Sequence, residues 1–260
     1  MNVQNCLKKG LITIKANHME SLISQVESYV ENNIAFFHIS RIDKLKSLQL
    51  DKLLKSKNPY LYKAKNLNTP QEVVENIASA FISSAEESMF GDWLEGLAIF
   101  VACQVYNGYK SAAEGVDLEM DKDGIHYFVS IKSGPKWSNS SSLKKMKENF
   151  LKAKRIYRTS NHKGLCEAVE GCCYGKEANI QKESHIKLCG ERFWEFISGS
   201  KSLYLDIIEP LGTDAINKNQ NYKQEYDKMI TRFTRDFISN YCDNAGNILW
   251  SKIVEINSGI

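Results

Sequence analysis

The chain has 260 residues, an apolar fraction of 43% and a formal net charge of +3, values typical of a globular protein that can bury a sizeable core. A net charge this small does not by itself indicate binding to nucleic acid. The distribution of the basic residues along the chain is the better guide. Seven cysteines, an odd number, favour reduced thiols. We find no signal-peptide pattern and no apolar run of about 18 residues, so we expect a cytoplasmic protein with no membrane partner.

The first 57 residues predict two amphipathic helices, over residues 19–32 and 42–54, where apolar side chains recur at spacings of three and four. We expect residues 1–57 to form an N-terminal helical segment that caps the molecule or helps to form a dimer interface. The alternative is that they are ordinary core helices. Residues 58–260 would then form the main domain, with its core at about 90–210.

A second pair of helices is predicted over residues 70–84 and 92–106, separated at Gly91. Asp92 and Glu95 then have the spacing of a capping box, in which a glutamate hydrogen-bonds to the start of its own helix. On this pattern alone, Glu95 has a structural role.

The following stretch predicts a β-hairpin whose turn is the Asp-Gly dipeptide at 123–124, the best signal for a tight type I′ turn. Counting back from this turn places Asp117 directly opposite Ser130. Because side chains alternate along a strand, Glu119 and Lys132 lie on the same face. One face of the hairpin would therefore carry two carboxylates, a hydroxyl and an ammonium.

This grouping suits metal-assisted hydrolysis of a phosphodiester. Mg²⁺ binds one or two protein carboxylates together with phosphate and water, and it polarises the phosphate and activates water. A lysine orients that water or stabilises the developing charge. The alternative is an exposed hairpin face whose polar residues only contact water.

A polar loop at residues 133–142 follows the lysine strand. Its small polar residues before a helix expose amides and hydroxyls to anions, or else they form a flexible connector. The candidate DNA-binding residues in the loop are Lys136, Ser138 and Asn139.

The next predicted helix, residues 143–158, is strongly basic. A charge run is usually a solvated face, but this one adjoins the candidate metal site, which favours contact with DNA phosphates. Its candidate DNA-binding residues are Lys144, Lys145 and Arg155, and its predicted buried stripe is Leu143, Met146, Phe150, Leu151 and Ile156.

The remaining pattern predicts strands over residues 165–176 and 203–208, a short helix over 193–197 that ends near Gly199, and a long helix over 219–241. Together these elements predict an α/β protein with a central mixed sheet flanked by helices.

Several of these residues resemble a known family. Asp117, a turn, and then Ser130-Ile131-Lys132 are similar to the PD-(D/E)xK nuclease core, with serine at a position that is usually acidic; that departure also occurs within the superfamily. The flanking motifs resemble type II restriction endonucleases, and the nearest group cuts RGGNCCY or related GGNCC-type sites. The resemblance runs from about residue 58 to the C-terminus. Its motifs are Asn58-Pro59-Tyr60-Leu61-Tyr62, Phe90-Gly91-Asp92-Trp93-Leu94-Glu95, Ser130-Ile131-Lys132-Ser133-Gly134, Gly171-Cys172-Cys173-Tyr174-Gly175, Gly190-Glu191-Arg192-Phe193-Trp194 and Asn244-Ala245-Gly246-Asn247-Ile248-Leu249-Trp250.

The resemblance implies Mg²⁺-dependent cleavage of double-stranded DNA by a PD-(D/E)xK core. It also implies a homodimer, because a palindromic site mirrors protein twofold symmetry, and a cognate DNA methyltransferase that protects the same site. Asp117 would bind the metal and Lys132 would position the nucleophile, with Ser130 beside them. In similar nucleases a helix glutamate before the hairpin reaches the metal, which indicates Glu95, with Glu119 as the other candidate.

Glu148 is a further candidate for the missing acidic ligand. In some nucleases with serine before the catalytic dipeptide, an acidic residue from the following helix fills that position. The alternative is an i,i+4 ion pair with Lys144 or Lys152.

Two other functions remain open. One is a repair or structure-specific nuclease of the same fold. The other is a DNA-binding protein of the same fold without catalysis, if the serine reflects decay of the site.

Overall fold

The computed structural model describes residues 3–160, 164–212 and 215–259, with side chains from residue 20 onward except those of residues 215–217. The chain divides into two compact units. Unit 1 comprises Met1–Ile34 and Phe90–Thr213, and unit 2 comprises Ala35–Met89 and Asp214–Ile260. Helices α1 (Val3–Ser47) and α4 (Pro70–Tyr106) contribute residues to both, so the units do not follow the predicted boundary after residue 57.

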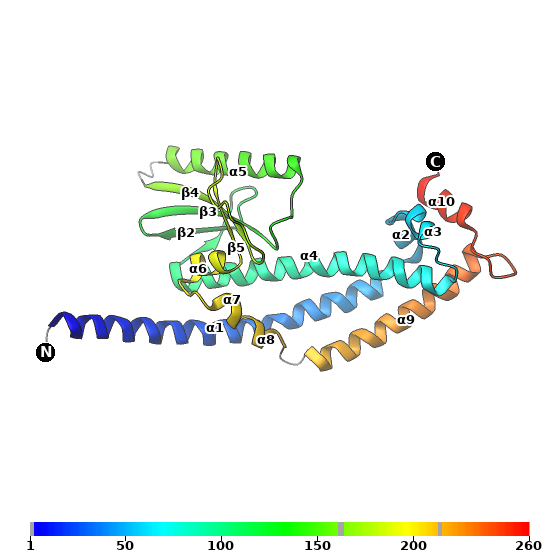
Figure 1. The fold of residues 1–260 in the computed structure, drawn as a ribbon, viewed down its shortest axis with the longest axis horizontal. Coiled ribbons are helices and arrows are strands. Elements are labelled where there is room, and N and C mark those ends of the chain that lie inside the picture. Colours follow the sequence, from blue (N-terminus) through cyan, green and yellow to red (C-terminus); the bar gives the residue numbers. More distant parts are fainter. Residues whose placement is uncertain (1–2, 161–163, 213–214, 260) are drawn as a thin grey trace. The chain divides into compact units, whose positions relative to one another are not determined.

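A five-stranded sheet forms the centre of unit 1 (Figure 1). The strand order is β1-β2-β3-β4-β5; β1, β2 and β3 pair antiparallel, whereas β3, β4 and β5 pair parallel. The mixed sheet predicted from the sequence is therefore confirmed. The strands are β1 (Tyr109–Lys110), β2 (Leu118–Lys122), β3 (Ile125–Lys132), β4 (Leu165–Cys172) and β5 (Ile186–Cys189).

The hairpin β2–β3 has the predicted register. Lys122 pairs with Ile125 across the turn, and both turn residues, Asp123 and Gly124, have positive φ angles of 52° and 77°, as a type I′ turn requires. At the far end, the amide of Asp117 donates to the carbonyl of Val129 at 2.9 Å. Asp117 therefore lies immediately before β2.

Helices cover both faces of this sheet (Figure 1). On one face, β-strand side chains such as Leu118 and Val129 pack with Leu97 of α4 and Phe193 of α6. On the other face, Phe128 packs with Phe150 of α5. Besides its portions of α1 and α4, unit 1 contains the helices α5 (Ser140–Thr159), α6 (Glu191–Ser198), α7 (Leu203–Asp206) and α8 (Ile208–Gly212).

Gly171 of β4 permits the close approach of α6. A Cβ atom built on Gly171 would lie 2.2 Å from the ring of Phe193, a separation that real Cβ atoms do not show. The bare backbone at this position therefore allows the Phe193 side chain, which is fully buried, to pack directly against the strand.

Unit 2 is helical in the part that the structure describes. Leu53, Val73, Ile77, Phe233 and Phe237 belong to its buried core. Besides its portions of α1 and α4, it contains α2 (Leu50–Lys55), α3 (Pro59–Ala64), α9 (Ala215–Tyr241) and α10 (Trp250–Ser258).

Two predicted helix breaks are wrong. The break expected between residues 32 and 42 does not occur, because α1 continues to Ser47 and is followed by α2. The helices expected over residues 70–84 and 92–106 are one continuous helix, α4. Gly91 does not end α4, because a glycine inside a helix costs only about 1 kcal/mol relative to alanine and the flanking apolar faces are buried on both sides of it.

The predicted strand over residues 203–208 is also wrong, because Leu203–Asp206 forms α7; short apolar runs do not distinguish strand from helix by periodicity. On α5, Met146 and Phe150 are buried as predicted. Leu151 and Ile156 are instead 61% and 53% exposed, because they lie off the stripe formed by residues 146, 149, 150 and 153.

Candidate active site

The hairpin brings Asp117, Ser130 and Lys132 together at one end of β3, the central strand of the sheet. Asp117 Oδ2 accepts hydrogen bonds from the amide of Ile131 at 2.6 Å and from Ser130 Oγ at 3.3 Å. Lys132 Nζ lies 3.5 Å from the same oxygen. Asp117 and Lys132 are each only partly exposed. The carboxylate is therefore fixed by its own hairpin, with an ammonium beside it.

Glu95 approaches this group from α4. Its carboxylate lies 3.9 Å from Lys110 Nζ. Burial raises the pKa of Glu95, and the negative charge of Asp117 raises it further, while Lys110 and Lys132 act in the opposite direction. The charges of Asp117 and Lys132 therefore both act on the Glu95 carboxyl group. The capping-box explanation for Glu95 is wrong, because Asp92 lies inside α4 and starts no helix.

The helix α4 has its capping box elsewhere. Thr69 Oγ1 accepts from the amide of Glu72 at 3.2 Å, and Glu72 Oε2 accepts from the amide of Thr69 at 3.1 Å. This reciprocal pair satisfies the start of the helix at Pro70. Glu95 therefore has no capping function to perform.

Comparison with known proteins identifies the family. The family model described as type II restriction endonuclease EcoO109I matches residues 24–219, a stretch that includes the whole sheet and the Asp117 group. The chain belongs to the type II restriction endonuclease EcoO109I family. It is therefore a nuclease, and its family implies that it binds DNA. No curated protein matches the chain.

Restriction endonucleases typically use a divalent metal, and two carboxylates of this EcoO109I-family chain fit Mg²⁺. The side-chain contacts of Asp117 among the described residues all reach Oδ2, which leaves Oδ1 for a cation. The repulsion between Asp117 and Glu95 that raises the pKa of Glu95 is what a bound cation would relieve. Mg²⁺ needs only one or two protein carboxylates, with water completing its shell.

Glu119, the other candidate to complete the metal environment, has partners of its own. Among the residues that the structure describes, no group of three His, Cys, Asp or Glu side chains lies close enough to hold a metal ion. Glu119 instead accepts from Tyr109 Oη at 3.1 Å and from Ser111 Oγ, and it contacts His126 Nε2 at 3.1 Å. Its oxygens are thus engaged by side chains of β1, of β3 and of the residue that follows β1.

Glu148 does not join the Asp117 group in the contacts of the described chain. Its carboxylate lies 4.0 Å from Lys144 Nζ, the i,i+4 pair that the sequence left open, and both side chains are exposed. Glu148 also lines a different hollow, together with Lys147 and Arg155.

The loop and helix after Lys132 border a hollow of about 520 Å³ that opens onto the candidate site. Asn139 is the N-cap of α5, since its Oδ1 accepts from the amide of Ser142 at 2.9 Å. Lys136 and Ser138 are exposed. The hollow is lined by Gly115, Ser130, Lys132, Trp137, Ser141, Ser142, Lys145, Met146 and Asn149.

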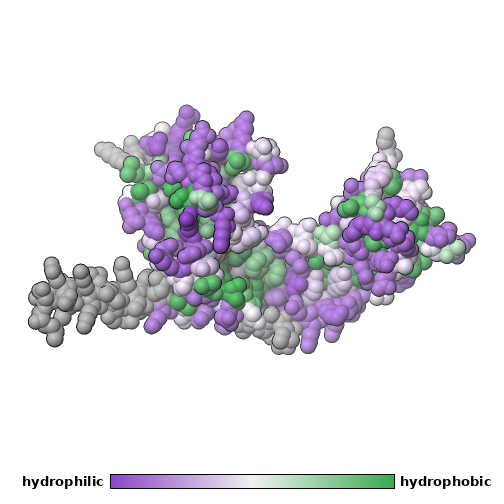
Figure 2. Space-filling model, viewed as in Figure 1, coloured by the Kyte–Doolittle hydropathy of each residue, from purple (hydrophilic) through white to green (hydrophobic). Residues whose placement is uncertain are grey.

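The outer face of α5 is hydrophilic, as Figure 2 shows over that part of unit 1. Lys145 pairs with Glu114 at 2.9 Å. Five of the ten residues that line a second hollow beside α5 are basic: Lys147, Lys152, Lys154, Arg155 and Arg158. The predicted DNA-binding lysines and arginine of α5 are thus exposed on one helix next to the candidate site.

Sequence reasoning missed a buried carboxylate, Glu170 of β4. It pairs in register with Ser130 on the neighbouring strand β3, so it lies on the same face of the sheet as the candidate site. Only the register of the parallel β3–β4 pair brings it there, so the sequence offered no local signal beyond a charged residue inside an apolar run.

None of the described helices is both long enough and apolar enough to span a membrane.

Proposed function

We propose that the protein is a type II restriction endonuclease that cleaves double-stranded DNA at specific sites in a Mg²⁺-dependent reaction. The observation that carries the proposal is the meeting of Asp117 with Lys132 at 3.5 Å, with the charge of Glu95 acting on both, in a chain of this nuclease family.

In this proposal, Asp117 and Glu95 hold the metal. When bound, Mg²⁺ would act as a Lewis acid: it would polarise the scissile phosphate and make water a better nucleophile. Lys132 orients the attacking water and stabilises the negative charge that develops on phosphate oxygens. Ser130 is buried and acts through Asp117 by donating a hydrogen bond to Oδ2, so it is a positioning residue. Glu119 and Glu148 have other partners.

DNA phosphates would contact the exposed basic side chains on α5 and the loop before it. Lys145 lines the hollow that contains Lys132, whereas Arg155 lies along the outer hollow. The remaining candidates for phosphate contact are Lys136, Ser138, Asn139 and Lys144. Phosphate contacts orient the protein on the duplex but carry no direct sequence information.

The biological setting follows from the same proposal. We infer a homodimer, because a twofold-symmetric site is read by a twofold-symmetric protein. The sites would belong to the RGGNCCY or GGNCC type, and a cognate DNA methyltransferase would protect them. We also infer a cytoplasmic location, with which the free thiols of the described cysteines agree.

The decisive experiment is digestion of genome-scale DNA with Mg²⁺, followed by sequencing of all fragment ends. Ends that share one short sequence of the GGNCC type would support the full proposal. Ends at a different short sequence would support a restriction endonuclease and reject the site group. Ends without a common sequence would favour a repair or structure-specific nuclease. Retained binding without cleavage would favour a DNA-binding protein.

The contribution of α5 can be tested by the salt dependence of DNA binding. Each phosphate contact releases counterions, so removing one lowers the slope of log K against log salt by about 0.9 for duplex DNA. We expect this decrease in slope for Lys145→Ala and for Arg155→Ala, measured in Ca²⁺ or EDTA so that the DNA is not cleaved. A matched control is Lys228→Ala, whose side chain is also exposed but lies in unit 2 beside Glu225. Unchanged slopes for the α5 variants would mean a merely solvated helix face.

A further inference from the structure

A closed ionic cluster lies beside the candidate site. Glu170 is 1% exposed and its carboxylate accepts from four side chains: Lys187 Nζ at 2.7 Å, Trp137 Nε1 at 2.8 Å, His185 Nε2 at 3.1 Å and Cys172 Sγ at 3.8 Å. Burial acts to raise the pKa of Glu170, but the hydrogen bonds from His185, Lys187 and Trp137 lower it to about 2. The carboxylate is therefore charged and fully partnered, and its function lies in what it holds.

What it holds is the loop that follows Lys132. The indole of Trp137 is bound directly, and Lys187 Nζ also donates to the carbonyl of Pro135 at 3.1 Å. The backbone at the start of this loop is tied to the end of β4, since the amide of Cys173 donates to the carbonyl of Lys132 at 2.9 Å. The loop is thus fixed at several points between Lys132 and α5.

The fixed indole faces the lysine of the site. Lys132 Nζ lies 5.2 Å from the centre of the Trp137 ring and 3.5 Å from Asp117 Oδ2. An ammonium is attracted to the face of an indole, and a lysine side chain otherwise has several rotatable bonds. The ring and the carboxylate together restrict where the ammonium can lie.

We propose that Trp137 is a positioning residue for Lys132, and that Glu170, with His185 and Lys187, fixes the indole in place. This inference rests on the proposed function, because Lys132 must be the group that acts on the phosphodiester. Trp137 and Glu170 touch neither substrate nor metal in this scheme. They act through the position of one ammonium group.

The kinetic test compares Trp137→Leu with Trp137→Phe in Mg²⁺-dependent cleavage. The leucine variant lacks the aromatic face, and we expect kcat to fall by about tenfold to a hundredfold, the scale of a catalytic group displaced by about 1 Å. KM should stay near the wild-type value, because DNA contacts on α5 are intact. The phenylalanine variant keeps a ring but loses the bond to Glu170, so its kcat should lie between those of the leucine variant and the wild type.

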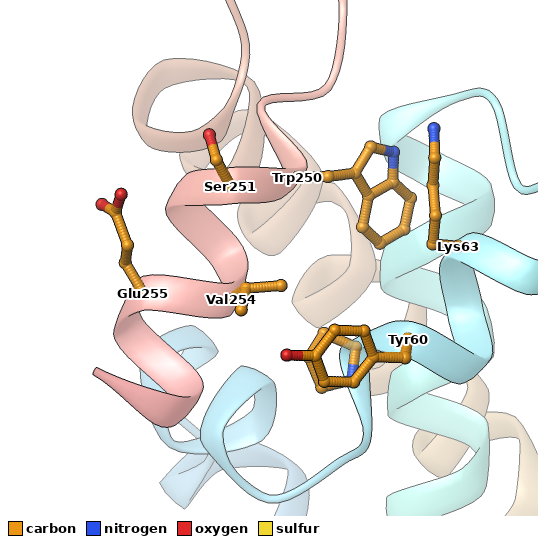
Figure 3. Close-up of a pocket in the computed structure, with 7 residues that line it drawn as sticks. Tyr60, Lys63, Trp250, Ser251, Val254 and Glu255 are labelled. Carbon is orange, nitrogen blue, oxygen red and sulfur yellow. The ribbon is translucent and has the colours of Figure 1, made fainter.

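A matched control exists in unit 2. Trp250 is also partly buried, and Lys63 Nζ lies 5.4 Å from its ring centre; the two side chains line a surface pocket shown in Figure 3. Trp250→Leu therefore removes an equivalent lysine–indole contact in which Lys132 takes no part, and kcat should not change. On β4, Glu170→Gln should lower kcat at unchanged KM. Its control, Glu167→Gln, breaks an ion pair with Lys154 and should keep the wild-type kcat.

A spectroscopic readout follows the lysine itself. Protein labelled with ¹³C at the lysine ε carbon gives one correlation signal per ordered lysine, and Lys132→Arg identifies the signal of Lys132. In the wild type this signal should be displaced upfield by the ring current of Trp137. In Trp137→Leu the displacement should be lost, whereas Trp250→Leu should leave it unchanged.

The outcomes separate this inference from the proposed function. An inactive Lys132→Ala enzyme together with wild-type kcat for Trp137→Leu overturns the inference and leaves the function standing. So does a Lys132 signal that does not move in that variant. A Lys132→Ala enzyme as active as the wild type overturns both. If the leucine variant does not fold, Trp137→Phe decides: lower kcat at unchanged KM supports the inference, and wild-type kcat overturns it.

Discussion

Two carboxylates in unit 1, Glu95 of α4 and Glu170 of β4, have opposite electrostatic situations, although a lysine lies near each of them. Glu170 is the more deeply buried, at 1% exposed against 28% for the Glu95 side chain. Its pKa is nevertheless lowered to about 2, whereas the pKa of Glu95 is raised by burial and by the charge of Asp117. Burial alone therefore does not determine the charge state; the number and sign of the partners do.

This difference separates two functions within one site. Around Glu170, the ammonium of Lys187 and hydrogen bonds from Trp137, His185 and Cys172 stabilise the charge, so the cluster supports its surroundings. The negative charge of Asp117 acts unfavourably on Glu95 and is only partly offset by Lys110 and Lys132, a condition that a divalent cation would relieve. Asp117 and Glu95 are therefore the better candidates for chemistry, and the fully hydrogen-bonded Glu170 is the better candidate for a structural role.

The largest effect expected is the loss of DNA cleavage when Asp117 or Lys132 is replaced. Asp117→Asn keeps the shape but removes the charge that would hold the metal, and Lys132→Ala removes the ammonium; each should lower cleavage by roughly 10³-fold or more. Single-turnover rates at saturating DNA would measure this. Asp121→Asn, on the same hairpin but 75% exposed, serves as a control and should stay active. A folded and fully active Asp117→Asn enzyme would end this interpretation.

The second test sharpens the assignment of the second carboxylate. Glu95→Gln should abolish metal-dependent cleavage while DNA binding survives, with a loss of roughly 10²-fold or more. Glu119→Gln and Glu148→Gln should retain most of the activity, because their carboxylates are engaged by His126 and Lys144. If Glu148→Gln is the inactive variant instead, the acidic ligand comes from α5 and not from α4.

The third test addresses stability at the satisfied cluster. Glu170→Gln leaves Lys187 and His185 without their charged partner, and breaking a buried pair in this way costs about 3–5 kcal/mol. The depressed pKa of Glu170 means that its contribution is present above the ordinary value of 4.5 and is lost as pH falls toward about 2. Urea midpoints should therefore differ most near pH 7 and converge in acid. Equal midpoints at neutral pH would contradict the account of this cluster.

The smallest effect expected has the opposite sign. Because the pKa of Glu95 is raised, the folded protein loses stability as pH rises above 4.5 and through the higher folded-state value. Without metal, Glu95→Gln should therefore unfold at a slightly higher temperature than the wild type at neutral pH, and at the same temperature below pH 4.5. Thermal unfolding in EDTA at several pH values would test this. A destabilised glutamine variant at neutral pH would mean that the carboxylate is well partnered.

The hairpin was the most predictable part of the site. Its turn dipeptide fixes the register through local backbone geometry, so the pairing of Asp117 with Ser130 follows from counting. The basic helix was also predictable, since its periodic pattern is long. These features depend on residues that are close together in the sequence.

The remaining features depend on tertiary packing. The continuity of α4 through Gly91 is decided by burial on both sides of the glycine, which no local rule contains. The Glu170 cluster draws Trp137 from the loop before α5, and His185 and Lys187 from one segment at the start of β5. The strand β5 has too few residues to show a period. A charged residue within an apolar strand was the available signal for Glu170, but its partners were not predictable.

The bare backbone at Gly171 affects how mutations of β4 would be interpreted. Any side chain there would displace the Phe193 ring, so a screen of random variants should reject nearly every substitution at this position. It would then rank Gly171 beside Asp117 and Lys132, although it takes no part in the chemistry. Intolerance to substitution in this strand thus has two sources, the ionic cluster on one face and the docking of α6 on the other, and measured kcat separates the docking of α6 from catalysis.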